Sequence, residues 1–239
     1  MANVLQLRVS LKDFEPVVWR RVLVPDAIAL PRLHRVIQQL MLWWNYHMHS
    51  FEIGDEEFGQ TELDEDDDFH WRNERGVKIA QLVPVGSSLQ YSYDFGDNWQ
   101  LLIEVEAVHA VQFALKHAVC IDGNFAAPPE DVGGTGGFRQ FLDALGDPSD
   151  EEHENYLEWS GGNYDFSRCD LAEINARLPA GALTLFRSSS LGGLEAITLG
   201  AGLDDVGVKG EPVDDGRHQP GVGNDLAPLG EGQVRRRRD

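Results

Sequence analysis

The stretch "LQLRVSLKDFEPVVWRRVLVP" (residues 5–25) contains two apolar segments joined by a polar turn. In the first segment, every second side chain is apolar: Leu5, Leu7, Val9 and Leu11. A period of two indicates a strand with one buried face. The second segment, residues 17–25, is rich in β-branched side chains and ends at Pro25, which is typical of a partner strand. We therefore predict that a β-hairpin begins the fold.

Ser10 raises a question of chemistry, because it follows Arg8 by two residues in the arrangement seen at the start of serine recombinases. Such an enzyme also needs several arginines that stabilise the transferring phosphoryl group, together with a DNA-binding module such as a helix-turn-helix. The sequence shows neither motif. We therefore expect Ser10 to lie on the outer face of the strand, pointing away from the core.

Residues 31–44 follow the hairpin with a different pattern. Pro31 suits the first turn of a helix. Apolar side chains then recur at spacings of three and four: Leu33, Val36, Ile37, Leu40, Met41 and Trp44. This spacing predicts an amphipathic helix whose apolar stripe packs on the sheet.

Two further parts of the chain alternate as strands do. In residues 47–53, one predicted face carries His47, His49, Phe51 and Ile53. Residues 88–108 predict a strand, a turn and a second strand, with the turn chemistry supplied by residues 96–98. Between these parts, segment 54–76 contains a run of acids and predicts a solvated loop.

The region after the second pair of strands is less regular. Residues 120–137 are rich in Pro and Gly, and we expect no regular secondary structure there. Three short helices are predicted to follow, over 137–145, 149–158 and 170–178. The last of them begins at Asp170 with a glutamate three residues later, which resembles a capping box.

The composition changes at residue 181, after which Gly, Pro and Asp are frequent and Phe186 is the one aromatic residue. Such a composition does not favour a packed core. We therefore predict two parts. Residues 1–180 form an α+β domain with a mixed, largely antiparallel sheet and flanking helices, and residues 181–239 form a Gly/Asp-rich, low-complexity and disordered tail.

The charge balance bears on the choice of partner. The chain has 239 residues and a formal net charge of −20, so its surface repels the phosphate backbone that duplex-binding proteins neutralise with Lys and Arg. This favours a protein partner over nucleic acid. A weak contact with DNA is expected only through four arginines near the end of the chain: Arg235, Arg236, Arg237 and Arg238.

The cysteines and the apolar runs bear on location. Only Cys120 and Cys169 are present, which is not a disulfide framework and fits a reducing compartment. The first residues lack the basic and apolar regions of a signal peptide, and no apolar run is long enough to span a membrane. We expect a cytoplasmic protein without membrane contact.

His47 and His49 form the first pair of candidate ligands. Two residues apart on a strand, they would share a face, and Asp94, Asp97, His70 or Glu130 would then complete a site of nitrogen and oxygen ligands. The alternative is that the histidines pack and form hydrogen bonds at the junction of helix and strand. A His-x-His pair does not decide between these readings, and the sequence identifies no metal or cofactor.

Two carboxylate pairs are further candidates. Asp94 and Asp97 in "YDFGDNWQ" would suit acid–base chemistry, or one of them caps backbone amides of the turn while Phe95 and Trp99 pack on the core. Glu130 and Asp131 open "EDVGGTGG" (residues 130–137), whose amides would suit an anion. This segment lacks the Gly-Lys-Ser/Thr ending of a phosphate-binding loop, and we expect an ordered structural loop.

Four blocks of the sequence resemble a known family. They are "LRVSLKDFEPVVWRRVLVP", "LHRVIQQLMLWWNYHMHSFEI", "YSYDFGDNWQLLIEVE" and "PPEDVGGTGGFRQFLDAL". In this order, over about residues 4–178, they are similar to the plasmid ORF-3-like family, whose members are also labelled insertion-sequence passenger proteins of the TnpR type. The resemblance implies an α+β fold with a mixed sheet and flanking helices, and a plasmid or mobile-element context. It implies no particular reaction.

Three functions follow from these observations, and whether the protein is an enzyme stays open. The leading hypothesis is an accessory or passenger protein of a mobile genetic element, linked to transposition and acting through protein contacts. The second is a hydrolytic or resolvase-like enzyme whose site includes His47, His49, Asp94 and Asp97. The third is a small-ligand or metal-binding module at the same place. The last two require these side chains to converge in space.

Overall fold

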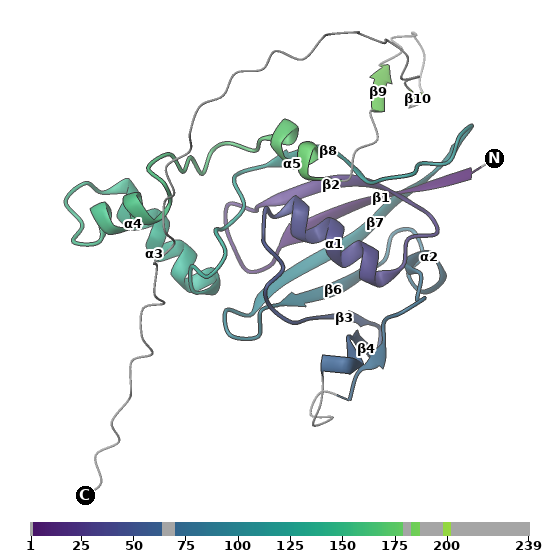
Figure 1. Ribbon diagram of the computed structural model, residues 1–239, viewed down its shortest axis with the longest axis horizontal. Helices are drawn as coiled ribbons and strands as arrows, with labels where there is room; N and C mark the ends of the chain where they lie inside the picture. Colours follow the sequence, from purple (N-terminus) through teal and green to yellow (C-terminus); the bar gives the residue numbers. More distant parts are fainter. Residues whose placement is uncertain (1, 64–69, 179–182, 187–197, 202–239) are drawn as a thin grey trace, which may run out of the picture. The chain divides into compact units, whose positions relative to one another are not determined.

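A computed structural model describes residues 2–63, 70–178, 183–186 and 198–201. These residues form an eight-stranded sheet in the order β5-β4-β3-β6-β7-β1-β2-β8 and a separate two-stranded sheet (Figure 1). The strands of the large sheet are β1 (Ala2–Leu11), β2 (Trp19–Pro25), β3 (His49–Ile53), β4 (Glu56–Gly59), β5 (Arg72–Asn73), β6 (Ser88–Tyr93), β7 (Trp99–Val111) and β8 (Val119–Asn124). All neighbours in it are antiparallel except β4 and β5, so the predicted mixed, largely antiparallel sheet is confirmed.

The N-terminal hairpin forms as predicted. β1 and β2 pair antiparallel with Val9 opposite Arg20, and β1 lies between β2 and β7 in the middle of the sheet. The alternating apolar side chains enter the main hydrophobic core: Leu5, Leu7, Val9 and Leu11. The period of two therefore identified the buried face of this strand.

Ser10 lies outside both hydrophobic core clusters, but it is not on an exposed surface as we expected. Its side chain is 8% exposed, and Oγ has no hydrogen-bond partner among the residues that the structure describes. The reason is its place in the sheet, where the neighbouring strands on both sides carry large side chains opposite it. Ser10 is paired with Trp19 on β2 and Leu102 on β7, and Arg8 lies over the Trp19 ring.

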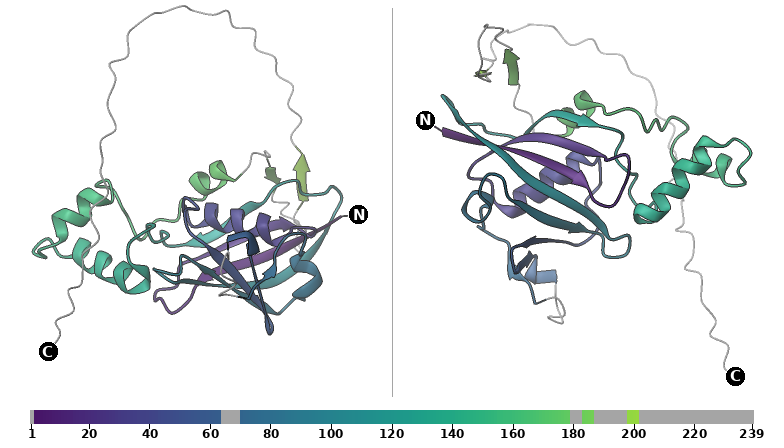
Figure 2. Two further views of the ribbon diagram at one scale, coloured as in Figure 1. Left: turned by 60° about the horizontal axis from the view of Figure 1, so that its bottom comes forward. Right: turned by 180° about the vertical axis from the view of Figure 1, so that it is seen from behind.

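Helix α1 (Leu30–Leu40) lies on one face of the sheet (Figures 1 and 2). Its buried side chains include the predicted stripe of Leu33, Ile37 and Leu40. The helix ends four residues earlier than predicted, because Leu42 has a left-handed backbone with φ of 59°. Trp44 is consequently 63% exposed rather than part of the stripe.

Two segments expected to be irregular contain strands. The acid-rich segment 54–76 contributes β4, the short helix η1 (Thr61–Leu63) and β5, although residues 64–69 lie outside the described part. The Gly-rich segment after residue 119 contributes the edge strand β8. Gly123 is needed there for a close approach, since a Cβ on it would lie 2.8 Å from Cys169 Sγ and 2.9 Å from Arg20 Cδ. Glycine signals close packing here and not a turn.

Of the remaining helices, the short α2 (Ile79–Leu82) precedes β6, and three follow β8 as predicted: α3 (Gly134–Gly146), α4 (His153–Trp159) and α5 (Leu171–Arg177). Asp170 caps α5 by accepting a hydrogen bond from Glu173 N at 3.0 Å. The prediction that Phe95 packs on the core is wrong, because its side chain is 38% exposed, whereas Trp99 is fully buried.

The tail predicted from residue 181 is described only in part. β9 (Leu183–Phe186) and β10 (Thr198–Ala201) pair antiparallel within the segment for which we expected no regular structure. The chain divides into two units, residues 1–202 and 203–239. Arg235–Arg238 and the rest of the second unit lie outside the described residues, so the boundary at residue 180 stays a prediction.

Candidate functional site

Three side chains from distant parts of the sequence meet at one end of the sheet. They are His47 before β3, Asp94 after β6 and Asp131 between β8 and α3. His47 Nε2 lies 3.0 Å from Asp131 Oδ1 and 3.6 Å from Asp94 Oδ2. The three ligand atoms lie within 4.8 Å of one another. Three of the seven residues that the sequence identified as candidates therefore converge.

The backbone orients both carboxylates. Asp94 and Asp131 have left-handed backbones, with φ of 53° and 61°, a conformation that Asp tolerates better than most residues. Asp94 Oδ1 accepts a hydrogen bond from Gly96 N at 3.0 Å, as expected for a capping residue of this turn. Its other oxygen, Oδ2, faces His47. Conformations of this kind are often retained at functional sites.

Asp97 fixes the loop that carries Asp131. Its Oδ2 accepts a hydrogen bond from Gly133 N at 3.0 Å. Gly134, with φ of 67°, packs closely against the same turn, and a Cβ on it would lie only 2.3 Å from Asp97 O. Asp97 is therefore a structural residue beside the cluster, and its carboxylate is engaged with the backbone.

Glu130 is likewise engaged. Its Oε2 accepts a hydrogen bond from Trp44 N at 2.6 Å, and its Oε1 accepts one from the hydroxyl of Tyr93. Burial and this bond to a carboxylate raise the pKa of Tyr93 well above its ordinary value, so the phenol stays protonated as a donor. Glu130 thus ties the segment after α1 to β6 and does not belong to the three-residue cluster.

His49 belongs to a second, buried cluster. Its Nε2 lies 3.0 Å from Glu74 Oε2, and both side chains are 2% exposed. Its ring stacks on that of His34, with the centroids 3.5 Å apart. Of the two alternatives, packing and hydrogen bonding describes His49, and the two histidines lie in separate clusters. β3 begins only at His49, and the two histidines have different partners.

The hydrogen bonds of His34 define its tautomer. His34 Nε2 lies 2.5 Å from Asn45 Oδ1, an acceptor, so Nε2 carries the proton. Nδ1 then accepts from the Tyr91 hydroxyl at 2.8 Å, and that hydroxyl accepts from Gln38 Nε2 at 3.0 Å. Burial, followed by the charge of His49, lowers the pKa of His34 to about 3. This histidine is neutral at physiological pH.

Sequence reasoning missed His34, Gln38 and Glu74. The first two have a signal in the sequence, since they are polar residues four apart beside the apolar stripe of α1. Glu74 has none, because it lies in a segment with many acids that are exposed. His70, which we named as a possible ligand, is exposed and is not part of the cluster of His47.

The donor set of the first cluster suits a divalent transition metal. One imidazole and two carboxylates are ligands that Zn²⁺, Mn²⁺ and Fe²⁺ accept. Atoms bound to one such ion at about 2.0–2.2 Å lie at most about 4.4 Å apart, so a small movement of these side chains would form a site. The buried cluster cannot act in this way as it stands, because each donor atom of His34 already has a partner.

The fold and the cluster define an α+β protein with a candidate cation site at one end of its sheet. The sequence model of the plasmid pRiA4b ORF-3-like proteins matches residues 3–173, and the chain belongs to that family. It is 36% identical over 177 residues to the uncharacterized protein y4hQ of Sinorhizobium fredii, covering 73% of this chain and 90% of that protein.

A solved structure is also similar. It is the crystal structure of MM3350, a protein of unknown function from Methanosarcina mazei Go1, with a TM-score of 0.66 and 30% sequence identity. The similarity covers 72% of this chain and 98% of that one. In the parts of the chain that the structure describes, no helix has the length and apolar content needed to cross a membrane.

Proposed function

We propose that this plasmid ORF-3-like domain binds a divalent transition-metal cation through His47, Asp94 and Asp131. The observation that supports the proposal is the convergence of three ligand atoms from three separate segments within 4.8 Å. This corresponds to the metal-binding module among the functions that the sequence leaves open.

The surroundings of the cluster support the proposal. Asp94 is 12% exposed, whereas His47 and Asp131 are 33% and 62% exposed, so an ion has access from the solvent and meets a mostly buried carboxylate. Without an ion, His47 Nε2 can donate its proton to Asp131. A cation would replace that proton, because only the unprotonated nitrogen is a ligand. A neutral imidazole meets this condition when its proton is carried on Nδ1 instead.

The test is titration of the metal-free protein with Zn²⁺ and, separately, Mn²⁺ by isothermal calorimetry. We expect one saturable site. His47→Gln and Asp131→Asn should each weaken binding by about tenfold or more, as loss of one ligand does. Asp143→Asn is the matched control, because Asp143 is an exposed aspartate on α3 outside the cluster. Equal binding by His47→Gln and the wild type contradicts the proposal.

We also propose an accessory role in a plasmid or another mobile element, exerted through protein contacts. Support comes from the plasmid origin in the family's name and from the net charge of −20, which disfavours duplex DNA. Resolvase chemistry is not part of this proposal, because the nucleophile it would need, Ser10, is buried in a central strand. Loss of transposition of the parent element on deletion of the gene would support the role, and unchanged transposition would contradict its link to transposition.

A further inference from the structure

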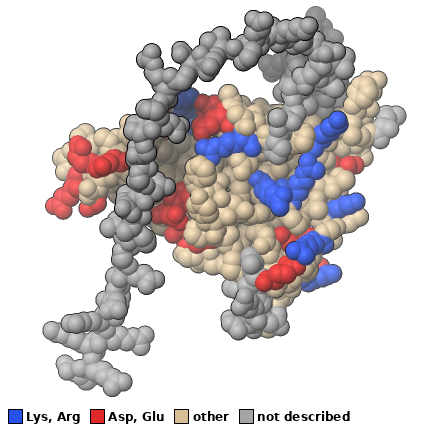
Figure 3. Space-filling view, in the orientation of Figure 1, with Lys and Arg blue, Asp and Glu red and all other residues tan. Residues whose placement is uncertain are grey.

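A basic groove lies on the solvent side of α1. It shares no lining residue with the His47 cluster. Its volume is about 660 Å³, and it is lined by Ala29, Pro31, Arg32, Arg35, Val36, Gln39, His117, Ala118 and Arg177. None of these residues is acidic, although the chain carries a net charge of −20. Figure 3 shows Lys and Arg side chains gathered on the face that carries α1.

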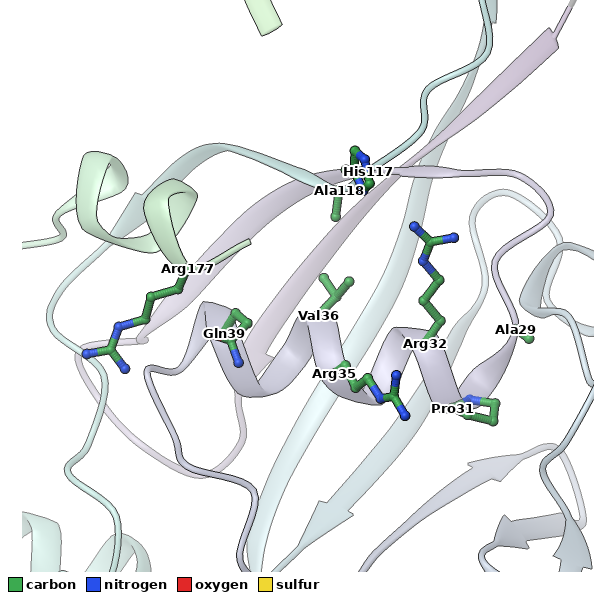
Figure 4. A pocket seen from close by; sticks show the side chains of 9 residues that line it. All are labelled: Ala29, Pro31, Arg32, Arg35, Val36, Gln39, His117, Ala118 and Arg177. Carbon is green, nitrogen blue, oxygen red and sulfur yellow. The ribbon is translucent and has the colours of Figure 1, made fainter. Parts of the chain in front are cut away.

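The helix repeat and the fold bring the groove together. Arg32, Val36 and Gln39 are spaced by four and three residues, so they share one side of α1. Figure 4 shows Arg32 and Val36 pointing toward the segment that carries His117 and Ala118, while Arg177 comes from α5. The β-bridge between Ala29 and Lys78 places one more basic residue beside the groove. Two helices and the segment before β8 thus form its walls.

The cationic groups are incompletely neutralised. Arg35 is exposed, and among the described residues its side chain forms neither a hydrogen bond nor an ion pair. Arg32 uses one nitrogen, Nη2, to donate to Lys116 O at 2.8 Å, which fixes the side chain and leaves its other donors available. Arg177 shares its charge with Glu173 at 3.2 Å. In addition, His117 Nδ1 is buried without a partner in the described part of the chain.

We infer that this groove binds a small molecule carrying a chain of phosphate groups. Guanidinium groups match phosphate oxygens in geometry and charge, and a cavity of this volume is within the range of small-ligand sites, about 300–1,000 Å³. Val36, Ala118 and Pro31 add apolar walls, which suit an organic group attached to the phosphates. An extended nucleic acid fits less well, because its backbone would continue onto an acidic protein.

The test is calorimetric titration of the full chain with ATP and with inorganic tripolyphosphate. EDTA is present throughout, so that binding does not depend on the proposed metal site. Saturable binding of either probe is expected. If ATP binds and tripolyphosphate does not, the ligand is an organic molecule that carries phosphates. If both bind equally, the groove recognises the phosphate chain itself.

The variants Arg32→Gln and Arg35→Gln should each weaken binding by about tenfold, the usual effect of losing a hydrogen bond to a charged group. Arg75→Gln removes the same charge from an exposed arginine outside the groove, where it pairs with Glu62, and should bind as the wild type does. Gln39→Trp keeps every charge but fills the groove, so it should also abolish binding. Unchanged thermal unfolding midpoints will show that the variants are folded.

Three results would overturn the inference. The first is that neither probe binds the wild type. The second is equal weakening in Arg75→Gln and Arg35→Gln, which would indicate attraction to net charge and not to the groove. The third is tighter binding of a twelve-nucleotide single strand than of either small probe, which would indicate a nucleic-acid surface instead.

Discussion

The imidazole rings of His34 and His49 stack with their centroids 3.5 Å apart and an interplanar angle of 5°, although one ring comes from α1 and the other from β3. Only His49 has a carboxylate partner, Glu74, and both members of that pair are 2% exposed. His34 is neutral and serves as donor to Asn45 and acceptor from Tyr91. The stack thus joins α1 to the sheet through two polar networks, one around each ring.

The first prediction concerns the buried partner of His49. Glu74 Oε2 lies 3.0 Å from His49 Nε2. Replacing Glu74 with Ala removes this acceptor and leaves the buried imidazole without its hydrogen bond. Leaving a buried polar group without its hydrogen-bond partner costs about 1–3 kcal/mol, so we expect a loss of this size in the free energy of unfolding measured with urea. Glu52→Ala, an exposed glutamate on β3, is the control and should change that free energy by less than about 0.5 kcal/mol. Equal effects of the two substitutions would show that the buried pair contributes nothing.

The second prediction concerns pH. The pKa of His34 is lowered to about 3 in the folded protein, whereas an unfolded histidine has a pKa of about 6.5. Between these values the unfolded chain binds a proton that the folded protein does not, so stability falls as pH decreases from about 6.5 toward 3. The slope from one such group is about 1.4 kcal/mol per pH unit.

The measurement compares the wild type with His34→Gln by urea unfolding at pH 7, 6 and 5. The titratable groups that act on His34, namely His49, Arg35 and Tyr91, are present in both proteins, so the difference between the two curves reports the substituted residue. We expect a shallower loss of stability in His34→Gln below pH 6.5. Parallel curves would mean that the pKa of His34 is the same in the folded and unfolded protein, which would contradict the prediction.

The third prediction concerns Ser10. Its Oγ is buried without a partner among the described residues, so Ser10→Ala removes a polar group that gains nothing from folding. Such a change is neutral or stabilising, here by at most about 1 kcal/mol. Val9→Asp should unfold the protein, because it places an unpaired charge in the core. Denaturant unfolding measures the stability of both variants. A clear loss of stability in Ser10→Ala would indicate that Ser10 Oγ forms a hydrogen bond in the native protein.

Local patterns in the sequence predict much of this fold. The alternation in residues 5–11 and the helical spacing after Pro31 identified buried faces, because these periodicities depend only on neighbouring residues. The end of α1 was not predictable in this way, since the left-handed backbone of Leu42 is not a preference of leucine. β8 was missed because Gly123 is required by Arg20 and Cys169, which are distant in sequence.

The candidate site could be predicted from the sequence only in part, for a similar reason. The sequence identified His47, Asp94 and Asp131 as residues of suitable chemistry, but their convergence depends on three loops that meet only in the folded sheet. Spacing could not separate His49 from them, because its alternative partner, Glu74, lies in a segment with many other acids. Choosing among chemically suitable residues therefore needed the tertiary structure.

The last prediction connects the fold with the proposed metal site. Gly134 has φ of 67°, and a Cβ on it would lie 2.3 Å from the backbone oxygen of Asp97. Gly134→Ala must therefore push the loop away from the turn after β6, at a cost of about 1–3 kcal/mol. The displaced loop carries Asp131, so metal binding should weaken even if the variant folds. Gly136→Ala is the matched control, because a Cβ there meets nothing within 4 Å and alanine favours the helix by about 1 kcal/mol. Unfolding and metal titration of both variants measure the two effects, and full metal binding by a folded Gly134→Ala would show that the loop does not position Asp131.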